Sequence, residues 1–316
     1  MLVLLFPGQG SQRAGMGGPW RDQPSWEVVE RLSDVTGRDL ATLLLDAGPD
    51  ELRMTANAQI ATFTLSLVAL DAVRRALPPG AVERGPVTAV GGHSLGEYTA
   101  LVAAGALSAE DGAGLVQARG DAMQAAAEAS PGTMAAVLGL ALDEVEEACR
   151  EATAGAWVAN DNAPGQVVVA GSLAGVEQAG GHLVRRGAKR VIQLQVGGAF
   201  HSPLMASAQG RLDAALAGAS FSGTTMPVVA NVDARLHTDG FGALLSAQLC
   251  SRVRWRESLI ELGARGGRLF VELGPGTELS GMVRRTVTEV SRANVSGPED
   301  IGPLVAQVEA LMGSPA

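Results

Sequence analysis

Aromatic residues and lysine are scarce in this sequence. Only 3% of its 316 residues are aromatic, and Lys189 is the single lysine. Ala, Val and Leu must therefore build most of the hydrophobic core. Positive charge is also in short supply, since the formal net charge is −9. Long-range attraction to nucleic acid or to an anionic membrane surface is disfavoured by this balance, and we expect neither as a partner.

Cysteines and long apolar runs are few as well. Cys149 and Cys250 stand apart, with no Cys-x-x-Cys motif and no cluster with histidine. A disulfide framework or a zinc site is not indicated, so we expect no metal and a cytoplasmic location. The apolar segment 60–70 is interrupted by Thr and Ser, which favours a buried helix over a membrane span. The apolar N-terminus lacks the basic start of a signal peptide.

Hydrophobic residues make up 47% of the chain, which is typical of a globular protein. Short apolar runs at 2–6, 87–91, 227–230 and 269–272 predict buried strands. Helical patterns fill most of the chain up to about residue 77, and residues 78–86 are expected to form a surface loop. Apolar strands that alternate with helices predict an α/β fold with a parallel sheet covered on both faces.

The middle of the chain has a different pattern. Residues 133–196 predict the order strand, helix, strand, strand, helix, strand, which is the ferredoxin-like unit. This unit is too short to hold the main sheet, so we expect an insertion. The predicted organisation is a large subdomain over 1–130 and 198–316, with a small ferredoxin-like subdomain over 131–197.

The segment "GGHSLGEY" places Ser94 between glycines, after a predicted strand and before a predicted helix. This is the G-x-S-x-G nucleophile-elbow pattern, in which a sharp turn exposes the serine hydroxyl. The glycines let the strand and the helix pass closely. The amide of Leu95, at the start of the helix, is placed to donate to an oxyanion. The alternative is a tight glycine turn with no chemistry.

A serine nucleophile needs a base, and four histidines are available. His93 adjoins Ser94, so the sharp turn should aim the two side chains apart. His182 falls on a helix of the inserted unit and His237 in a polar loop. His201 follows a strand and two glycines, directly before a helix N-cap pattern, where α/β sheets place ligands. We expect His201 to be the base; the alternative is a loop histidine that only packs.

The third member of a triad is less obvious. No Asp or Glu stands out, so a backbone carbonyl or a Gln side chain remains as the acceptor that orients the imidazole. The N-terminal glycine loop has G-x-G at Gly8 and Gly10, but Arg13 occupies the third glycine position of a dinucleotide motif. We expect an exposed loop whose amides lie beside Ser94; a plain glycine turn is the alternative.

Arg119 lies on a predicted helix, next to the apolar face formed by Leu115, Ala118 and Ala122. A buried arginine needs a partner, and a carboxylate that accepts two hydrogen bonds is the natural one. That carboxylate belongs either to an internal Asp or Glu or to a substrate.

Seven segments together resemble one known family: the malonyl-CoA:acyl carrier protein transacylases and the acyltransferases of fatty-acid and polyketide synthases. They occur in the family's order between residue 6 and about residue 285, and they are "FPGQGSQ", "GHSLGEY", "QARGDAMQ", "NDNAPGQVVVAG", "GAFHSPLM", "QLCSRVRW" and "VELGPGTELSGMVRR". The ordered set is far more specific than any one motif. It implies an α/β-hydrolase-like large subdomain with a ferredoxin-like insert.

The resemblance also assigns roles. It makes Ser94 the nucleophile and His201 the base, with the amides of Gln9 and Leu95 as the oxyanion hole. Arg119 would hold the free carboxylate of a malonyl group.

Four further residues complete the implied site. The backbone carbonyl of Gln248 would orient His201, and Met123 and Gln166 would line or support the pocket. Phe200, where family members vary, should crowd the acyl α-carbon. The resemblance implies no cofactor, because coenzyme A enters as part of the substrate.

The sequence therefore predicts an enzyme that moves a malonyl or related carboxyacyl group from coenzyme A to an acyl carrier protein, and we expect a monomer. Three alternatives remain: a hydrolase that edits acyl carrier proteins, a transacylase moving an unusual acyl group between carriers, and a non-catalytic carrier-binding module. Because carrier proteins are acidic, docking should use a local basic patch. The candidates are Arg185, Arg186, Lys189, Arg190, Arg284 and Arg285.

Overall fold

A computed structural model describes residues 1–78, 81–85 and 87–313. Its larger sheet has six strands in the order β10-β9-β1-β2-β7-β8. Neighbouring strands are parallel except for the antiparallel pair β7 and β8. The strands are β1 (Leu2–Phe6), β2 (Val87–Gly92), β7 (Val228–Val229), β8 (Leu236–His237), β9 (Leu269–Leu273) and β10 (Ser291–Val295).

Strand β1 shows how helices cover both faces of this sheet. Leu2, Leu4 and Phe6 belong to one hydrophobic cluster, and Val3 and Leu5 belong to another on the opposite face. Alternate side chains of a strand point to opposite faces, so a strand buried on both sides must be apolar throughout. The first face packs against helices that include α4 and α6, and the second packs against α12 and α13.

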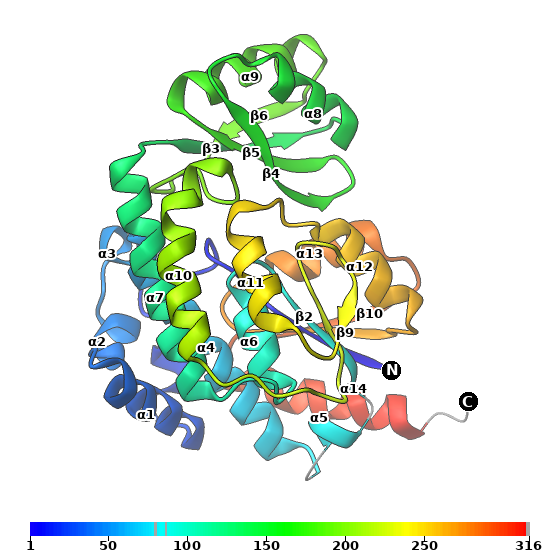
Figure 1. Cartoon of the computed structure of the whole chain (residues 1–316). Coiled ribbons are helices and arrows are strands. Elements are labelled where there is room, and N and C mark those ends of the chain that lie inside the picture. Colours follow the sequence, from blue (N-terminus) through cyan, green and yellow to red (C-terminus); the bar gives the residue numbers. More distant parts are fainter. Residues whose placement is uncertain (79–80, 86, 314–316) are drawn as a thin grey trace.

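The smaller sheet lies above the larger body, and two helices cover its outer side (Figure 1). Its four antiparallel strands have the order β4-β5-β3-β6, in the chain order β3, α8, β4, β5, α9, β6. The ferredoxin-like arrangement is thus present. The elements are β3 (Thr133–Leu138), α8 (Leu142–Glu151), β4 (Ala156–Ala163), β5 (Gln166–Gly171), α9 (Leu173–Arg185) and β6 (Arg190–Gln193).

Alternation along these strands gives the small sheet two different faces. Ala135 and Val137 of β3 join the cluster beneath α8 and α9. Met134 of β3 and Val168 of β5 point the other way and join the main core. The insert therefore presents an apolar sheet face toward the larger body.

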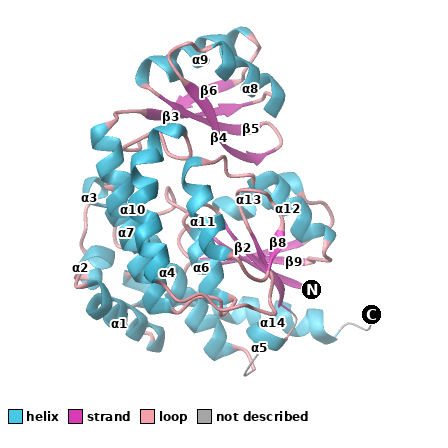
Figure 2. Cartoon of the chain, viewed as in Figure 1, coloured by secondary structure: helices cyan, strands magenta, loops and turns pink. Residues whose placement is uncertain are grey.

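Helices make up most of the remaining structure, with strands and helices segregated into layers (Figure 2). The α-helices of the larger body are α1 (Glu27–Thr36), α2 (Leu40–Leu45), α3 (Pro49–Arg53), α4 (Thr55–Ala76), α5 (Ala81–Arg84), α6 (Gly96–Ala103), α7 (Ala109–Ala129), α10 (Ala206–Gly218), α11 (Phe241–Cys250), α12 (Trp255–Ala264), α13 (Glu278–Thr286) and α14 (Ile301–Gly313). The short 3-10 turns are η1 (Gly18–Trp20), η2 (Pro24–Trp26), η3 (Pro203–Met205) and η4 (Pro298–Asp300).

Helix α4 is long and apolar enough to cross a membrane by length and composition. In the structure, however, 83% of its most apolar window is buried inside the protein. It is a buried helix of the main core, as the sequence predicts.

Three details of the prediction are wrong. Residues 81–84, expected in a surface loop, form α5, because Ala81 and Val82 are buried against the main core; residues 79, 80 and 86 of that loop lie outside the described residues. His237, expected in a loop, belongs to the two-residue strand β8. Strand β10 was not predicted, because its edge position leaves most of its side chains partly exposed and polar.

Candidate active site

Ser94 lies at a sharp turn between β2 and α6, with a left-handed backbone (φ 52°). The flanking glycines are required by the backbone crossing at this turn. A Cβ added to Gly92 would lie 1.9 Å from the backbone of Gly96, and one added to Gly96 would lie 2.0 Å from the carbonyl oxygen of Phe6. No side chain fits at either position, so the strand–helix crossing depends on both glycines.

Substitution of Gly96 by alanine is expected to destabilise the protein. Overpacking a closely packed core typically costs about 1–3 kcal/mol of unfolding free energy, and a contact with rigid backbone belongs at the upper end. Urea denaturation measures the change. Gly114→Ala is the matched control, because an added Cβ on this exposed position of α7 meets nothing within 4 Å. Equal stability of the two variants would contradict the close crossing.

The Ser94 hydroxyl lies beside His201, which a separate left-handed turn (φ 57°) presents just before η3. Ser94 Oγ is 2.7 Å from His201 Nε2, and His201 Nδ1 is 3.0 Å from the backbone oxygen of Gln248. A carbonyl only accepts, so Nδ1 carries the hydrogen and Nε2 is free to accept the serine proton. Ser202 caps the following turn, as predicted, by accepting from the Leu204 amide.

His201 is 5% exposed, and burial is the main reason that its pKa falls to about 3. The nearby Arg119 cation lowers the pKa further, since a second positive charge is unfavourable there. The ring is therefore neutral at physiological pH and is available as a proton acceptor.

Arg119 lies inside α7 and is 1% exposed. Its guanidinium donates to Gln59 Oε1 at 2.8 Å, Ser94 Oγ at 3.0 Å and Gln248 Oε1 at 3.1 Å. It also lies over the ring of Tyr98, 5.6 Å from the centroid. Its Nε has no hydrogen-bond partner, and among the described residues no carboxylate forms an ion pair with it. The internal-carboxylate alternative is thus not realised as a direct contact.

Ser94, His201 and Arg119 lie at a cavity of about 290 Å³ between the two sheets. Gln9, Met123, Gln166 and Phe200 line it, together with Ser94, His201 and Arg119. The apolar face of the small sheet contributes further lining residues, namely Met134, Ala136, Val168, Leu194 and Val196. Gln166 also accepts a hydrogen bond from Arg285 of α13. The cavity is therefore lined by seven of the nine predicted site residues, whereas Leu95 and Gln248 are not among its lining residues.

Two backbone amides are candidates for an oxyanion hole, one from a residue that lines the cavity and one from the residue that follows Ser94 in the chain. Gln9 lies in the loop after β1, and Leu95 is the residue directly before α6. Within the described part of the chain, neither amide donates to a protein acceptor. Free amides beside a serine at a helix N-terminus are suited to an oxyanion.

The other histidines have different surroundings. The His93 ring turns to Asn162, with Nε2 2.8 Å from Oδ1, and packs edge-on against Trp255. His182 lies 2.9 Å from a carboxylate oxygen of Glu151, and His237 lies 2.9 Å from one of Asp233. Neither His182 nor His237 is among the cavity residues.

Two residues next to the serine were missed by the sequence analysis. Asn231 Oδ1 accepts from the Ser94 amide at 2.6 Å, and Asn231 Nδ2 donates to the carbonyl of Gly92 at 2.8 Å. Asn231 follows β7, so a polar residue at the carboxyl end of a predicted strand was the available signal. Glu97, in the first turn of α6, is 2% exposed and accepts from Asn231 and Gln248.

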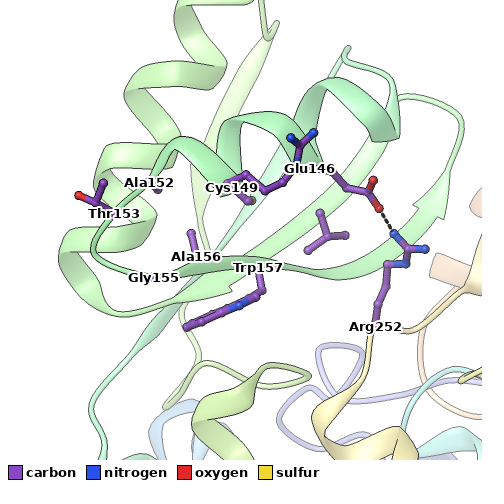
Figure 3. A pocket seen from close by; sticks show the side chains of 10 residues that line it. Glu146, Cys149, Ala152, Thr153, Gly155, Ala156, Trp157 and Arg252 are labelled. Carbon is purple, nitrogen blue, oxygen red and sulfur yellow. Dashed lines mark hydrogen bonds and ion pairs between the residues drawn. The ribbon is translucent and has the colours of Figure 1, made fainter.

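A larger hollow, of about 590 Å³, lies on the small subdomain against α8 and β4 (Figure 3). Trp157, Cys149 and Arg252 line it, and Arg252 pairs with Glu146. Burial raises the pKa of the Cys149 thiol to about 12, so this cysteine is not a thiolate nucleophile at neutral pH. The smaller cavity around Ser94 is the one equipped for chemistry.

No group of three or more His, Cys, Asp or Glu side chains in the described ranges is arranged to hold a metal ion.

The comparison with known families is decisive, because the model of the acyl transferase domain matches residues 3–307. The chain belongs to the acyl transferase domain family.

Individual members of this family are similar over nearly the full length. The malonyl CoA-acyl carrier protein transacylase of Bacillus subtilis (strain 168) is 39% identical over 308 residues, covering 95% of each chain. The crystal structure of an acyl-carrier-protein S-malonyltransferase from Burkholderia pseudomallei 1710b superposes with a TM-score of 0.90 at 36% identity, covering 96% of this chain and 99% of the other. A malonyl-transacylase solved with its type II polyketide synthase acyl carrier protein gives a TM-score of 0.90 at 32% identity, covering 97% of this chain and 99% of that one.

Proposed function

We propose that the protein is a malonyl-CoA:acyl carrier protein transacylase that works through an acyl-serine intermediate. One observation carries the proposal: Ser94 Oγ lies 2.7 Å from His201 Nε2 and 3.0 Å from Arg119, which is fully buried and forms no ion pair with a carboxylate of the described residues. A buried guanidinium without a counter-ion in direct contact is costly, and a substrate carboxylate would relieve that cost. The similarity to transacylases of this name over 95% of the chain supports the same function.

The proposed first half-reaction acylates the enzyme. Ser94 Oγ attacks the thioester carbonyl carbon while its proton passes to His201 Nε2. The oxyanion that forms accepts hydrogen bonds from the amides of Gln9 and Leu95. When the C–S bond breaks, the imidazolium returns its proton to the sulfur and coenzyme A leaves.

The second half-reaction reverses these steps with a different thiol. The phosphopantetheine thiol of the carrier gives its proton to His201 and attacks the ester carbonyl. The bond to Ser94 Oγ breaks, and Oγ recovers a proton from the imidazolium. The backbone oxygen of Gln248 holds the ring in the required tautomer throughout.

The remaining proposals concern the residues that select the substrate, the acyl donor, the oligomeric state and the location of the protein. Arg119 would bind the malonyl carboxylate, with Met123 and Gln166 lining the pocket and Phe200 crowding the acyl α-carbon. We also propose acyl-CoA as the donor, no bound cofactor, and a monomer in the cytoplasm.

The fate of the acyl group separates this function from its alternatives. With malonyl-CoA and a phosphopantetheinylated acyl carrier protein, malonyl should accumulate on the carrier faster than free malonate is released. An editing hydrolase would release the free acid instead. A transacylase for an unusual acyl group would take a larger acyl-CoA in preference from a mixed panel. Mass spectrometry of the carrier distinguishes the three outcomes.

Carrier docking should depend on exposed basic residues of the small subdomain and of α13, a helix that contributes lining residues to the cavity. Arg190 and Arg284 are exposed, whereas Arg186 is already paired with Glu151 and is a weaker candidate. Arg190→Glu with Arg284→Glu is expected to raise the KM for the carrier several-fold, and more at low salt, by local repulsion of an acidic partner. Acylation by malonyl-CoA alone should be unchanged.

The control for this double variant is Arg31→Glu on α1, which lies at the opposite end of the molecule from the small subdomain (Figure 1). Carrier transfer that is indifferent to salt and to the substitution of Arg190 and Arg284 would show that the carrier docks elsewhere.

A further inference from the structure

Glu97 occupies an unusual position behind the candidate active site. It lies three residues after Ser94, in the first turn of α6, and is only 2% exposed. A carboxylate in that turn is stabilised by the helix dipole, but burial requires hydrogen-bond partners as well. Glu97 Oε2 has two such partners, the backbone N–H of Asn231 and Nε2 of Gln248, each at 2.9 Å.

Both residues that hydrogen-bond to Glu97 also hydrogen-bond to Ser94. Asn231 Oδ1 accepts from the Ser94 amide at 2.6 Å, and Gln248 Nε2 also donates to the Ser94 carbonyl oxygen at 2.9 Å. The strained turn that presents the hydroxyl is therefore held at its amide and at its carbonyl by the side chains of two residues. Each of these residues also hydrogen-bonds to the Glu97 carboxylate, Asn231 through its backbone N–H and Gln248 through its side chain.

Gln248 connects the same carboxylate to two more reacting groups. Its backbone oxygen is 3.0 Å from His201 Nδ1, and its side-chain oxygen accepts from Arg119 at 3.1 Å. The Gln248 amide thus lies between the Arg119 cation and the Glu97 carboxylate, with its oxygen toward the cation and its nitrogen toward the anion. This orientation couples the two charges without direct contact.

We propose that Glu97 is a positioning residue, which fixes the Ser94 turn and the His201 ring through Asn231 and Gln248. Its negative charge also balances the positive charge of Arg119 when no substrate carboxylate is bound. The proposal rests on the proposed transacylase function. Glu97 is not among the residues that line the cavity, so it acts through its two partners. Its charge favours the imidazolium that forms on His201 as Ser94 attacks.

The charge state of Glu97 makes the proposal testable by pH. Burial is the main cause that raises the pKa of its carboxyl to about 7. The groups that face it are Arg119 on α7, which lowers the pKa, Asp233 after β7, which raises it, and the neighbouring Tyr98 ring. Glu97 therefore loses its proton across neutral pH, whereas His201 stays neutral throughout that range.

The decisive comparison is wild type against Glu97→Gln. The carboxamide oxygen can accept both hydrogen bonds, so this variant keeps the shape and removes the charge. At low malonyl-CoA concentration, where the free enzyme's ionisations are reported, wild-type acylation should rise with pH through an inflection near 7. Glu97→Gln should lose that inflection and acylate about tenfold more slowly at pH 8, with a smaller change in KM.

Two further variants complete the series. Glu97→Ala removes the acceptor as well, and misplacement of the reacting groups should lower the rate about a hundredfold. Glu110→Gln is the matched control, because Glu110 also lies in the first turn of a helix, α7, but pairs with Arg31 at the surface. It should keep the wild-type rate and inflection.

Persistence of the neutral inflection in Glu97→Gln would assign it to His201 and overturn the proposal. A measurement on the wild type does not depend on how the variants fold. Malonylation at pH 7 should take up protons from solution, whereas acetylation should not. The reason is that the malonyl carboxylate neutralises Arg119, so the Glu97 carboxylate loses its stabilising cation and becomes protonated. Equal proton uptake with both acyl groups would also overturn it.

Failure of the proposed function has a different signature. The wild type would then form no malonyl adduct at all. Glu97 would still be tested by the pH dependence of Ser94 phosphonylation with a fluorophosphonate probe, compared between wild type and Glu97→Gln.

Discussion

His201→Ala is expected to lower the rate of Ser94 acylation by about 10²–10⁴-fold, the range found when a positioned general base is removed. The physical reason is that Ser94 Oγ then loses the acceptor, His201 Nε2, that lies 2.7 Å away and can take its proton. Single-turnover acylation by malonyl-CoA, followed by intact-protein mass, measures the loss.

The controls are His182→Ala and His237→Ala, whose side chains meet surface carboxylates. Both should acylate near the wild-type rate. Equal losses in all three variants would mean that His201 contributes to stability and not to proton transfer.

The low pKa of His201 adds a stability effect with a defined sign. The unfolded chain takes up the proton near the ordinary value of 6.5, whereas the folded protein resists protonation down to about 3. The unfolded state binds more protons in that window, so this group makes the protein less stable as pH falls through it. His201→Ala should weaken this pH dependence of the unfolding free energy.

Arg119→Ala is expected to lower malonyl transfer strongly while keeping, or raising, slow transfer or hydrolysis of acetyl. Loss of a buried charged contact typically costs about 2–5 kcal/mol, so kcat/KM for malonyl-CoA should fall by about 30-fold to several thousand-fold. Arg31→Ala, at the surface, is the matched control. The measurement is competition between malonyl-, methylmalonyl- and acetyl-CoA on each protein.

The same competition tests Phe200 in the wild type. Malonyl should win over methylmalonyl by a moderate factor, since one methyl group in a close pocket changes preference by about 1–3 kcal/mol. If acetyl or a long neutral acyl chain wins on the wild type, Arg119 is a structural residue and one of the alternative functions becomes the better account.

The parts of the site that follow local rules were predictable from the sequence. The glycines around Ser94 and the capping pattern after His201 are local signals. The structure places Ser94 and His201 at the cavity. Helical spacing placed Arg119 beside a buried face, and it is fully buried.

Residues that act across distant segments were not predictable in this way. Asn231 and Glu97 lie 134 positions apart in the chain and meet only because β7 ends beside α6. Their types were visible, but which polar groups become partners is decided by tertiary packing. Strand β10 was missed because an edge strand does not need the continuous apolar run by which central strands are recognised.

The boundaries of the two subdomains at 131 and 197, and the roles assigned to individual side chains, remain predictions. The small sheet and its two helices occupy residues 133–193 of the observed structure. The arrangement of Ser94, His201 and Arg119 gives the proposed roles a geometry that experiments can test.

The most direct test of the account is the mass of the protein after brief incubation with malonyl-CoA. The wild type should gain one malonyl group, mapped by peptide analysis to Ser94, and a phosphopantetheinylated carrier should remove it. Ser94→Ala should gain none. A wild-type adduct on any other residue, or an adduct that forms equally on Ser94→Ala, would contradict the central claim.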